Sequence, residues 1–273
     1  MPHSHLTPLA QHAQDLLSAV RRDAPLVQCL TNFVSMNYAA NAVLAIGASP
    51  AMVHAEEEAP EFAGIAGAVV INIGTLSSPW LQSMLLTAKA AAHAGTPWVL
   101  DPVAHHATAF RRDAIQRLLD LKPAIIRGNA SEIIALAGGL SSGKGVDARD
   151  AVAHAEQSAR DIATQRQTVV AVTGETDYVT DGARAVHITG GSPLMPRVTA
   201  TGCALSAVVG AFAAVSRNDA FAAAVAALSC FGIAGQRAAL HSDGPGSFAW
   251  RFLDALAALH SASITGEIAL ALP

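Results

Sequence analysis

Short apolar runs rich in β-branched residues alternate along this sequence with Ala- and Leu-rich stretches of helical length. Strand and helix repeated in this way predict an α/β fold, with a mostly parallel central sheet and helices on both faces. The predicted strands are Leu26–Leu30, Ala68–Ile73, Trp98–Leu100, Ala124–Ile126, Thr168–Val172, Tyr178–Thr180 and Ala185–Ile188. The predicted helices between them are Met36–Ile46, Pro79–Ala94, Arg111–Leu121, Ser131–Ala137 and Ala148–Arg166.

The end of the chain departs from this alternation. The last two predicted strands are joined by Asp181-Gly182-Ala183-Arg184, and Asp-Gly is a hairpin signal, so one antiparallel edge is expected. From Gly202 onward the pattern predicts helices alone, at Cys203–Val215, Ala220–His241 and Ser247–His260. Neither an internal repeat nor a Pro/Gly/Ser-rich linker divides the sequence. We therefore expect residues 1–273 to form one domain.

Composition narrows the class of protein. Hydrophobic residues make up 52% and charged residues 14%, against about 25% charged in an average soluble domain, so intrinsic disorder is excluded. The formal charge is −4, and no stretch is dense in Lys or Arg, which argues against nucleic acid or an anionic membrane as a partner. The longest apolar windows, Ala204–Val215 and Ala220–Ala234, fall short of the roughly 18–20 residues that a membrane span requires.

The N-terminus and the cysteines bear on localisation. The N-terminus lacks the charged region and apolar core of a signal peptide. The three cysteines, Cys29, Cys203 and Cys230, are too few and too scattered for a disulfide framework. No CxxC motif is present, which argues against structural zinc. We expect a reduced, cytoplasmic protein.

Polar or Gly-bearing segments follow most of the predicted strands. Ligands of open α/β sheets sit beyond the carboxyl ends of the strands, so these segments are expected to line one cleft. They are Thr31-Asn32, Asn72-Ile73-Gly74-Thr75, Asp101-Pro102-Val103, Arg127-Gly128-Asn129, Thr173-Gly174-Glu175 and, at the start of a helix, Thr199-Ala200-Thr201-Gly202-Cys203.

The segment from Gly138 to Gly145 has the spacing of a P-loop up to its last position. A P-loop needs Ser or Thr after its Lys to hold magnesium, and Gly145 follows Lys144 here. The preceding segment is also predicted as helix rather than strand. We therefore interpret this segment as a surface loop. No GxGxxG fingerprint occurs anywhere in the sequence.

The Gly-bearing turn before Ala204 opens a long apolar helix. Free N–H groups and the positive end of the helix dipole make such a turn an anion site, and phosphoryl transfer needs donors of this kind. The structural alternative is an ordinary helix N-terminus, with Thr201 as its cap and Cys203 as a small buried residue.

Asn129 and Glu132 face the same way on a first helical turn. Amide and carboxylate oxygens are hard ligands suited to Mg²⁺, usually through its waters. The structural alternative is equally natural, because Asn129 caps the helix and Glu132 completes a capping box. Asp101, at a strand end, is ambiguous between a turn former and a site residue.

Together these motifs resemble one family, hydroxyethylthiazole kinase of the ribokinase-like superfamily. The similarity spans about Pro25 to Phe252, in family order. It is carried by Thr31-Asn32, the run from Asn41 to Met52, Asn72-Ile73-Gly74-Thr75-Leu76, Leu100-Asp101-Pro102-Val103, the run from Ile126 to Glu132, Lys144-Gly145-Val146-Asp147, Val172-Thr173-Gly174-Glu175 and Gly244-Pro245-Gly246-Ser247-Phe248.

The resemblance implies a three-layer ribokinase-like fold and phosphorylation of 5-(2-hydroxyethyl)-4-methylthiazole by ATP and Mg²⁺, in a homotrimer with sites at subunit interfaces. It also implies residue roles by position. Met52 and Asn32 would bind the thiazole, and residue 200 would contact it through the backbone. ATP would contact Arg127 and Thr173. Magnesium would be organised by Glu132, with Asn129 and Asp101 nearby, and the catalytic anion turn would comprise Gly202 and Cys203.

This sequence departs from the family pattern at two places. Ala200 stands where Gly is usual, so we expect it to lose access to positive φ and to place a methyl group beside the substrate. The loop containing His105 and His106 replaces a Gly-containing version. Adjacent His side chains diverge on any regular element, so we interpret this segment as a solvated loop rather than a metal site.

Cys203 stands where sugar kinases of the superfamily carry an Asp base. A thiol has a free pKa near ~8.5, which helix N-termini lower, but a loose transition state demands little early deprotonation of the alcohol. We hypothesise that Cys203 orients the hydroxyl and adds modest base catalysis. The alternatives are a related hydroxymethylpyrimidine or sugar kinase, which the lack of Asp at position 203 disfavours for sugars, and a non-catalytic sensor of a vitamin precursor.

Overall fold

A nine-stranded sheet forms the centre of the computed structural model, which describes residues 6–138, 148–216, 218–260 and 264–273. Its spatial order is β2-β1-β3-β4-β5-β6-β7-β8-β9. The strands are β1 (Leu26–Leu30), β2 (Ser49–Ala51), β3 (Ala68–Asn72), β4 (Trp98–Asp101), β5 (Ile125–Asn129), β6 (Val169–Thr173), β7 (Thr176–Thr180), β8 (Ala185–Thr189) and β9 (Ala269–Ala271). Neighbours from β2 to β6 pair in parallel, and β7, β8 and β9 add antiparallel pairs.

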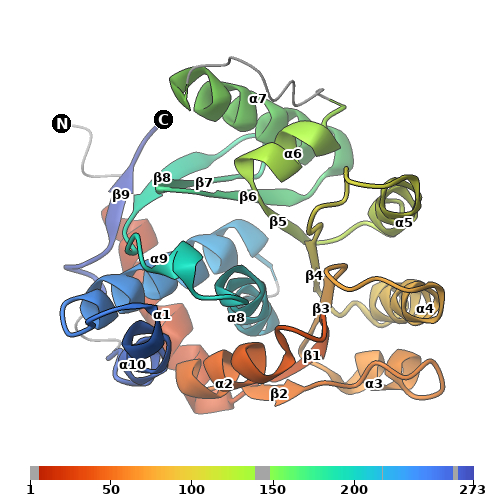
Figure 1. Ribbon diagram of the computed structural model, residues 1–273, viewed down its shortest axis with the longest axis horizontal. Helices are drawn as coiled ribbons and strands as arrows, with labels where there is room; N and C mark the ends of the chain where they lie inside the picture. The colour runs from red at the N-terminus through yellow and green to blue at the C-terminus, as the bar shows by residue number, and fades with distance from the viewer. Residues whose placement is uncertain (1–5, 139–147, 217, 261–263) are drawn as a thin grey trace.

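Helices cover both faces of this sheet and complete three layers (Figure 1). One face carries α1 (Thr7–Asp23), α2 (Met36–Ile46), α8 (Thr201–Val215), α9 (Ala220–Ala239) and α10 (Pro245–Ala257). The other carries α3 (Ala59–Ile65), α4 (Ser78–Ala94), α5 (Ala109–Leu119), α6 (Ala130–Leu136) and α7 (Ala148–Arg166). The predicted α/β class, with a mostly parallel sheet between two helical layers, is confirmed.

Successive strand residues point to opposite faces of the sheet, and helices cover both faces, which explains why the strands are apolar throughout. In β3, Val70 packs into the core on the side of α8, whereas its neighbours Val69 and Ile71 pack into the core on the side of α4. All five residues of β3 are buried. A strand whose two faces both meet helices has no solvated side, so it loses the polar alternation of a surface strand.

Every predicted strand and helix is found, with ends that shift by no more than three residues. The prediction of helices alone after Gly202 is wrong, because β9 pairs with β8 at the sheet edge. The α-helices and strands that were not predicted are α1, β2, α3 and β9. Of these, β2, α3 and β9 are short, and β2 and β9 depend on pairing with a neighbouring strand. Helix α1, in contrast, has an apolar stripe that is present in its sequence (Ala10, Ala13, Leu16, Leu17 and Val20).

Helix α9 is longer than its apolar window indicated. It runs for 20 residues, long and apolar enough to cross a membrane by length and composition, but 78% of the relevant window is buried inside the protein. It packs against α1, α8 and α10, so its apolar character serves the core.

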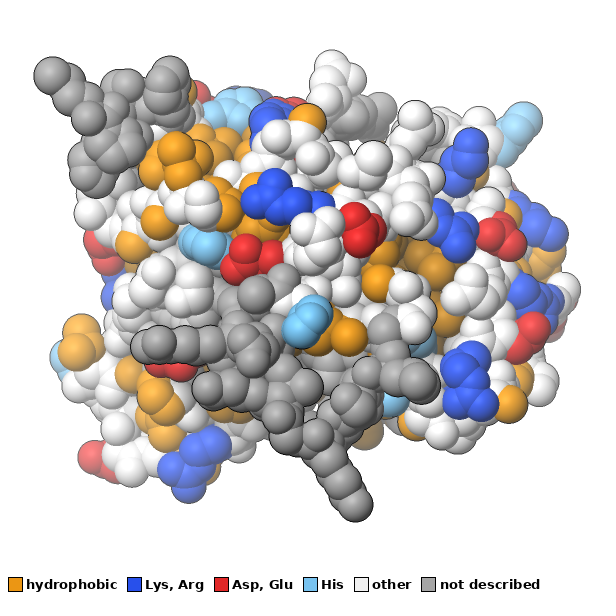
Figure 2. All heavy atoms as spheres, turned by 90° about the horizontal axis from the view of Figure 1, so that it is seen from above, with side chains coloured by type: hydrophobic (Ala, Val, Ile, Leu, Met, Phe, Trp, Pro, Cys, Tyr) orange, Lys and Arg blue, Asp and Glu red, His pale blue; other side chains and the backbone are white. Residues whose placement is uncertain are grey.

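Basic side chains are dispersed on the face shown in Figure 2, where Lys and Arg lie among acidic, apolar and uncharged groups. Most of the P-loop-like segment, residues 139–147, lies outside the described residues. Gly138, which ends the described stretch, follows α6 rather than a strand.

Candidate functional site

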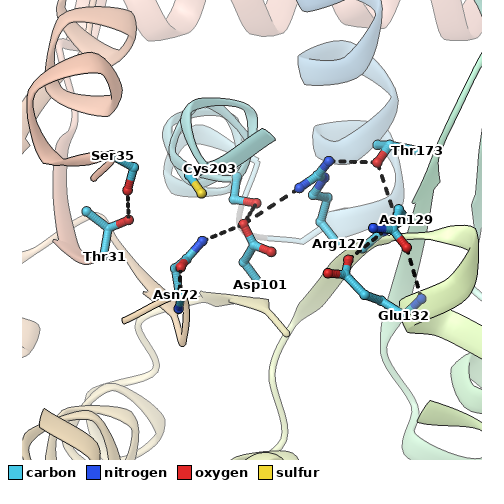
Figure 3. A network of polar contacts seen from close by, with 12 residues as sticks. Thr31, Ser35, Asn72, Asp101, Arg127, Asn129, Glu132, Thr173 and Cys203 are labelled. Carbon is cyan, nitrogen blue, oxygen red and sulfur yellow. Dashed lines mark hydrogen bonds and ion pairs between the residues drawn. The ribbon is translucent and has the colours of Figure 1, made fainter. Parts of the chain in front are cut away.

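The carboxyl ends of the parallel strands bring five of the predicted site residues into one network of polar contacts; Figure 3 labels Asp101, Arg127, Thr173 and Cys203 among them. Asn32 follows β1, Asp101 ends β4, Arg127 lies on β5, Thr173 ends β6 and Cys203 lies on the first turn of α8. These positions are far apart in the chain, and they meet because parallel strands end at the same edge of the sheet.

Arg127 lies at the centre of this network. Its Nη2 donates to Thr173 Oγ1 at 2.7 Å, and its Nη1 lies 3.6 Å from Asp101 Oδ2. The guanidinium also lies against Gly202, where an added Cβ would come within 3.1 Å of Nη1. Gly202 therefore lets the positive charge of Arg127 approach the start of α8.

Asp101 is a fully buried carboxylate with an asymmetric environment. Its Oδ2 accepts hydrogen bonds from Asn72 Nδ2 at 2.7 Å and Ser206 Oγ at 2.8 Å. Its Oδ1 has no hydrogen-bond partner among the described residues, although it is buried. Burial raises the pKa of Asp101 to about 6, and the charge of Arg127 opposes that rise.

The first turn of α8 points toward a cavity of about 790 Å³. Ala200 is the N-cap and supplies no side-chain hydrogen bond, so the first N–H groups of the helix are not capped from within it. Thr201 is the first helical residue rather than the cap, and its Oγ1 donates to Val198 O at 2.8 Å. Thr201 and Gly202 line the cavity together with Arg127 and Thr173.

Most of the rest of the cavity wall is apolar or glycine-rich, although Glu175, Asp177 and Ser192 also line it. It includes Pro193, Met195, Leu228 and Phe231, besides glycines of the segment after β8 and of α9. The cavity thus has a cationic end, at the edge of the sheet, and an apolar end, between α9 and the segment that follows β8. Such a division suits a ligand with a charged group and a flat apolar group.

Cys203 is a partly exposed thiol held as an acceptor. Its Sγ lies 3.2 Å from Asn32 Nδ2, which donates to it. Burial and the negative charge of Asp101 raise the thiol pKa, with the hydrogen bond from Asn32 opposing them. At Cys203 burial outweighs the lowering that a helix N-terminus gives a thiol in general, and the thiol is protonated at neutral pH.

Asn129 and Glu132 form the capping box that the structural alternative predicted. Asn129 Oδ1 accepts from Glu132 N at 3.0 Å, and Glu132 Oε2 accepts from Asn129 N at 2.9 Å. Glu132 also reaches outside its helix, because its Oε1 accepts from Ala104 N at 3.0 Å. Glu132 therefore ties the loop after β4 to the start of α6, close enough to Asp101 for its charge to raise the Asp101 pKa.

The hydrogen bonds of Met52, His105 and His106 in the described part of the chain do not join them to this network. Met52 follows β2 at the edge of the sheet and is partly buried against the core, whereas the network is built on β1 and the strands beyond it. The prediction of a solvated His105 is wrong, because its side chain is buried and burial lowers its pKa. His106 is exposed, and the described residues contain no cluster of three His, Cys, Asp or Glu side chains placed for a metal ion.

Ala200 adopts the conformation that its side chain was expected to prevent. Its φ is 68° and its ψ is −1°, a left-handed conformation that costs an L-residue roughly 1–2 kcal/mol.

We expect Ala200→Gly to raise the free energy of unfolding by about 1 kcal/mol, measured by urea denaturation. Ala207→Gly, inside α8, is the matched control and is expected to destabilise; a stability loss at both positions would contradict strain at Ala200.

Asp177 is a cavity residue that the sequence did not single out. Its Oδ1 accepts from Gly174 N at 3.0 Å, and burial raises its pKa to about 6. A raised carboxyl pKa means that this group disfavours the folded state increasingly as pH rises from about 4 through 6. Asp177→Asn is expected to stabilise the protein above pH 6 by about 2 kcal/mol, with the gain vanishing near pH 4.

Thermal unfolding across this pH range measures the effect. Asp219→Asn is the control of opposite sign, because the hydrogen bond from Arg184 lowers the pKa of Asp219. Removing that carboxylate is expected to cost stability at neutral pH and not near pH 3. A pH-independent effect of Asp177→Asn would show that its carboxyl is not the titrating group.

Comparison with known proteins adds an independent line of argument. The family model described as the hydroxyethylthiazole kinase family matches residues 17–262. A protein from Rhizobium leguminosarum bv. trifolii named hydroxyethylthiazole kinase is 66% identical over 249 residues, covering 91% of this chain and 93% of the relative.

Solved structures agree with these matches. A hydroxyethylthiazole kinase from Pyrococcus horikoshii superposes with a TM-score of 0.87 at 40% identity, covering 95% of this chain and 98% of that one. A ribokinase-like superfamily protein from Enterococcus faecalis superposes with a TM-score of 0.58 at 12% identity, covering 89% and 93%. The second match concerns the fold alone, and it confirms the expected ribokinase-like architecture.

Proposed function

The chain belongs to the hydroxyethylthiazole kinase family, and we propose that its cleft transfers the γ-phosphoryl group of ATP to the primary hydroxyl of 5-(2-hydroxyethyl)-4-methylthiazole. The observation that carries this proposal is the cationic end of the cavity, where Arg127, Thr173 and the uncapped start of α8 converge. Donors so arranged stabilise charge that spreads over a transferring phosphoryl group.

The division of the cavity supports an orientation for ATP. Its phosphates meet Arg127, Thr173 and the N–H groups near Gly202, and its base meets the apolar wall at Phe231 and Leu228. The acceptor alcohol approaches from the side of Asn32 and Cys203, with Met52 and the Ala200 backbone as further contacts. One sheet carries both halves of the site, which supports a single catalytic domain over residues 1–273.

The oxygen donors near Arg127 fit magnesium, which takes oxygen ligands and usually keeps several waters. Asp101 offers a buried carboxylate oxygen to which no described residue donates a hydrogen bond, and Glu132 is a second carboxylate near it. These two residues, with Asn129, would hold the ion. When bound, Mg²⁺ neutralises charge on the phosphates of ATP.

The surface supports assembly with further copies of the chain. Phe33 and Val34, in the turn before α2, are 65% and 61% exposed, and Leu44 and Ile65 are exposed to a similar degree. Large exposed apolar side chains of this kind are typical of subunit contacts, in keeping with a homotrimer whose sites lie at interfaces. The free thiols of all three cysteines support a cytoplasmic location.

Turnover of ATP with the thiazole alcohol tests the proposal. ADP and thiazole phosphate formed at catalytic rates exclude the sensor alternative, whereas binding without turnover contradicts the kinase. Parallel assays with a hydroxymethylpyrimidine and with sugars separate the related kinases, because the true acceptor has the highest kcat/KM.

Cys203 orients the acceptor hydroxyl and contributes modest base catalysis, because a protonated thiol is a weak base. We expect Cys203→Ser to keep measurable turnover, with kcat reduced about 10- to 100-fold, in a steady-state assay. Cys203→Asp tests whether a stronger base substitutes for the thiol. Complete loss in both variants, with intact folding, would contradict a modest role.

A further inference from the structure

A line of side-chain amides, those of Asn72 and Asn32, connects the buried carboxylate of Asp101 to the thiol of Cys203; Figure 3 shows Asn72, Asp101 and Cys203. Asn72 Nδ2 donates to Asp101 Oδ2 at 2.7 Å, and Asn32 Nδ2 donates to Asn72 Oδ1 at 2.9 Å. The same Nδ2 of Asn32 donates to Cys203 Sγ at 3.2 Å. The line crosses β4, β3, the segment after β1, and α8, so it joins four separate parts of the chain.

The direction of every hydrogen bond in this line is determined. Asp101 Oδ2 is an acceptor, so Asn72 must turn its amino group toward it and its oxygen toward Asn32. Asn72 Oδ1 accepts a further hydrogen bond from Gly74 N at 2.9 Å. Asn32 is held from its other side, because its Oδ1 accepts from the backbone N–H groups of Val34 and Ser35 at 3.1 Å each. Both hydrogens of the Asn32 amino group are therefore used, one for each acceptor.

Burial protects these hydrogen bonds from competition by water. Asp101, Asn72 and Asn32 are 0%, 1% and 6% exposed, so water does not compete for their polar atoms. Gly74 packs directly against the Asn32 amide, because a Cβ added at Gly74 would lie 2.6 Å from Asn32 Nδ2. The Asn32 amide thus has one available position and one orientation.

We propose that Asn72 is a positioning residue for the phosphoryl transfer: it holds the Asn32 amide so that Asn32 donates to Cys203 Sγ and fixes the thiol at the start of α8. Because a lone pair of the sulfur is engaged by Asn32, its S–H bond points away from Asn32. The inference rests on the proposed function, since it assigns Asn72 a part in that reaction, but its thiol component is measurable without substrate.

Alkylation measures the reactivity of the Cys203 thiol and its dependence on pH. Cys29 and Cys230 are 1% and 0% exposed, so iodoacetamide in native protein reports on Cys203. A donor to sulfur favours the thiolate. In Asn72→Ala, the pH midpoint of alkylation is expected to rise by about 0.5–1 unit and the rate at pH 7 to fall about 3- to 10-fold. With ATP and the thiazole alcohol, kcat is expected to fall about 10- to 100-fold, with the KM for ATP within about threefold of the original value.

Two further variants separate positioning from loss of structure. Gly74→Ala keeps every polar group of the line but displaces the Asn32 amide, so both readouts are expected to move as in Asn72→Ala. Thr168→Ala removes a buried 2.7 Å hydrogen bond to Pro123 O, before the start of β6, and is expected to lower stability without shifting the alkylation midpoint.

The outcomes distinguish this inference from the proposed function. An unchanged alkylation midpoint in folded Asn72→Ala and Gly74→Ala overturns the positioning role, whatever the turnover. A shifted midpoint with unchanged kcat also overturns it, because the thiol geometry then has no part in the reaction. Absence of turnover in the unsubstituted protein contradicts the proposed function instead, while the alkylation midpoints still report on the line of amides.

Discussion

Arg127→Lys is expected to lower kcat/KM for ATP about 100- to 1,000-fold while the protein stays folded. Arg127 Nη2 donates to Thr173 Oγ1 at 2.7 Å, its Nη1 forms an ion pair with Asp101 at 3.6 Å, and the planar guanidinium lies against Gly202. A Lys ammonium keeps the charge that pairs with Asp101 but is a point donor without the planar fork. Stabilisation of the transferring phosphoryl group is therefore lost with little change in ground-state charge.

Steady-state kinetics with varied ATP measure this effect, and thermal unfolding shows whether the fold is intact. Arg166→Lys is the matched control, because Arg166 pairs with Asp120 at 3.1 Å on the exposed surface, where ion pairs contribute little. A fall of less than threefold in Arg127→Lys would show that a positive charge alone suffices, and the proposed role of the guanidinium would be wrong.

Glu132→Gln is expected to lower kcat about 100-fold and the free energy of unfolding by about 1–3 kcal/mol. Both oxygens of Glu132 accept from backbone N–H groups, of Asn129 at 2.9 Å and of Ala104 at 3.0 Å. An amide of the same shape satisfies one of these donors and turns its own N–H groups toward the other. It also removes one of the two carboxylates proposed for magnesium.

The two consequences are measured separately, by urea denaturation without ligands and by turnover at increasing Mg²⁺ concentration. We expect the variant to need more Mg²⁺ for half-maximal turnover. Ser131→Ala is the control, since Ser131 lies on the same helical turn and donates to Asn129 Oδ1 from an exposed position. If stability falls but the Mg²⁺ dependence is unchanged, Glu132 is a structural residue alone.

Glu132 shows why two interpretations of one motif need not exclude each other. Asn129-Ala130-Ser131-Glu132 was open between a capping box and a magnesium site, and the capping box is present. The second oxygen of Glu132 reaches Ala104, 28 positions away in the chain, beside the buried Asp101. The motif specifies the cap through local geometry, whereas its place in the site depends on the loop after β4.

Asn72, Ser206 and Asp177 were not selected as individual site residues. Asn72 lay within a polar segment expected at the cleft, so its position was predicted. The sequence around a single Asn does not indicate which groups its amide will contact. Ser206 lay inside an apolar helix, and its bond to Asp101 spans 105 positions. Hydrogen bonds over such separations have no local signal, because they depend on how β4 and α8 pack.

The sequence by itself determined most of the strands and helices and the edge of the sheet where polar residues meet, because periodicity and strand-end position are local properties of the chain. Only the tertiary structure decided which of those residues touch, that Ala200 takes a positive φ, and that burial raises the Cys203 pKa. Desolvation and hydrogen bonds between Asn32 and Cys203, 171 positions apart, arise from packing and not from the neighbouring sequence.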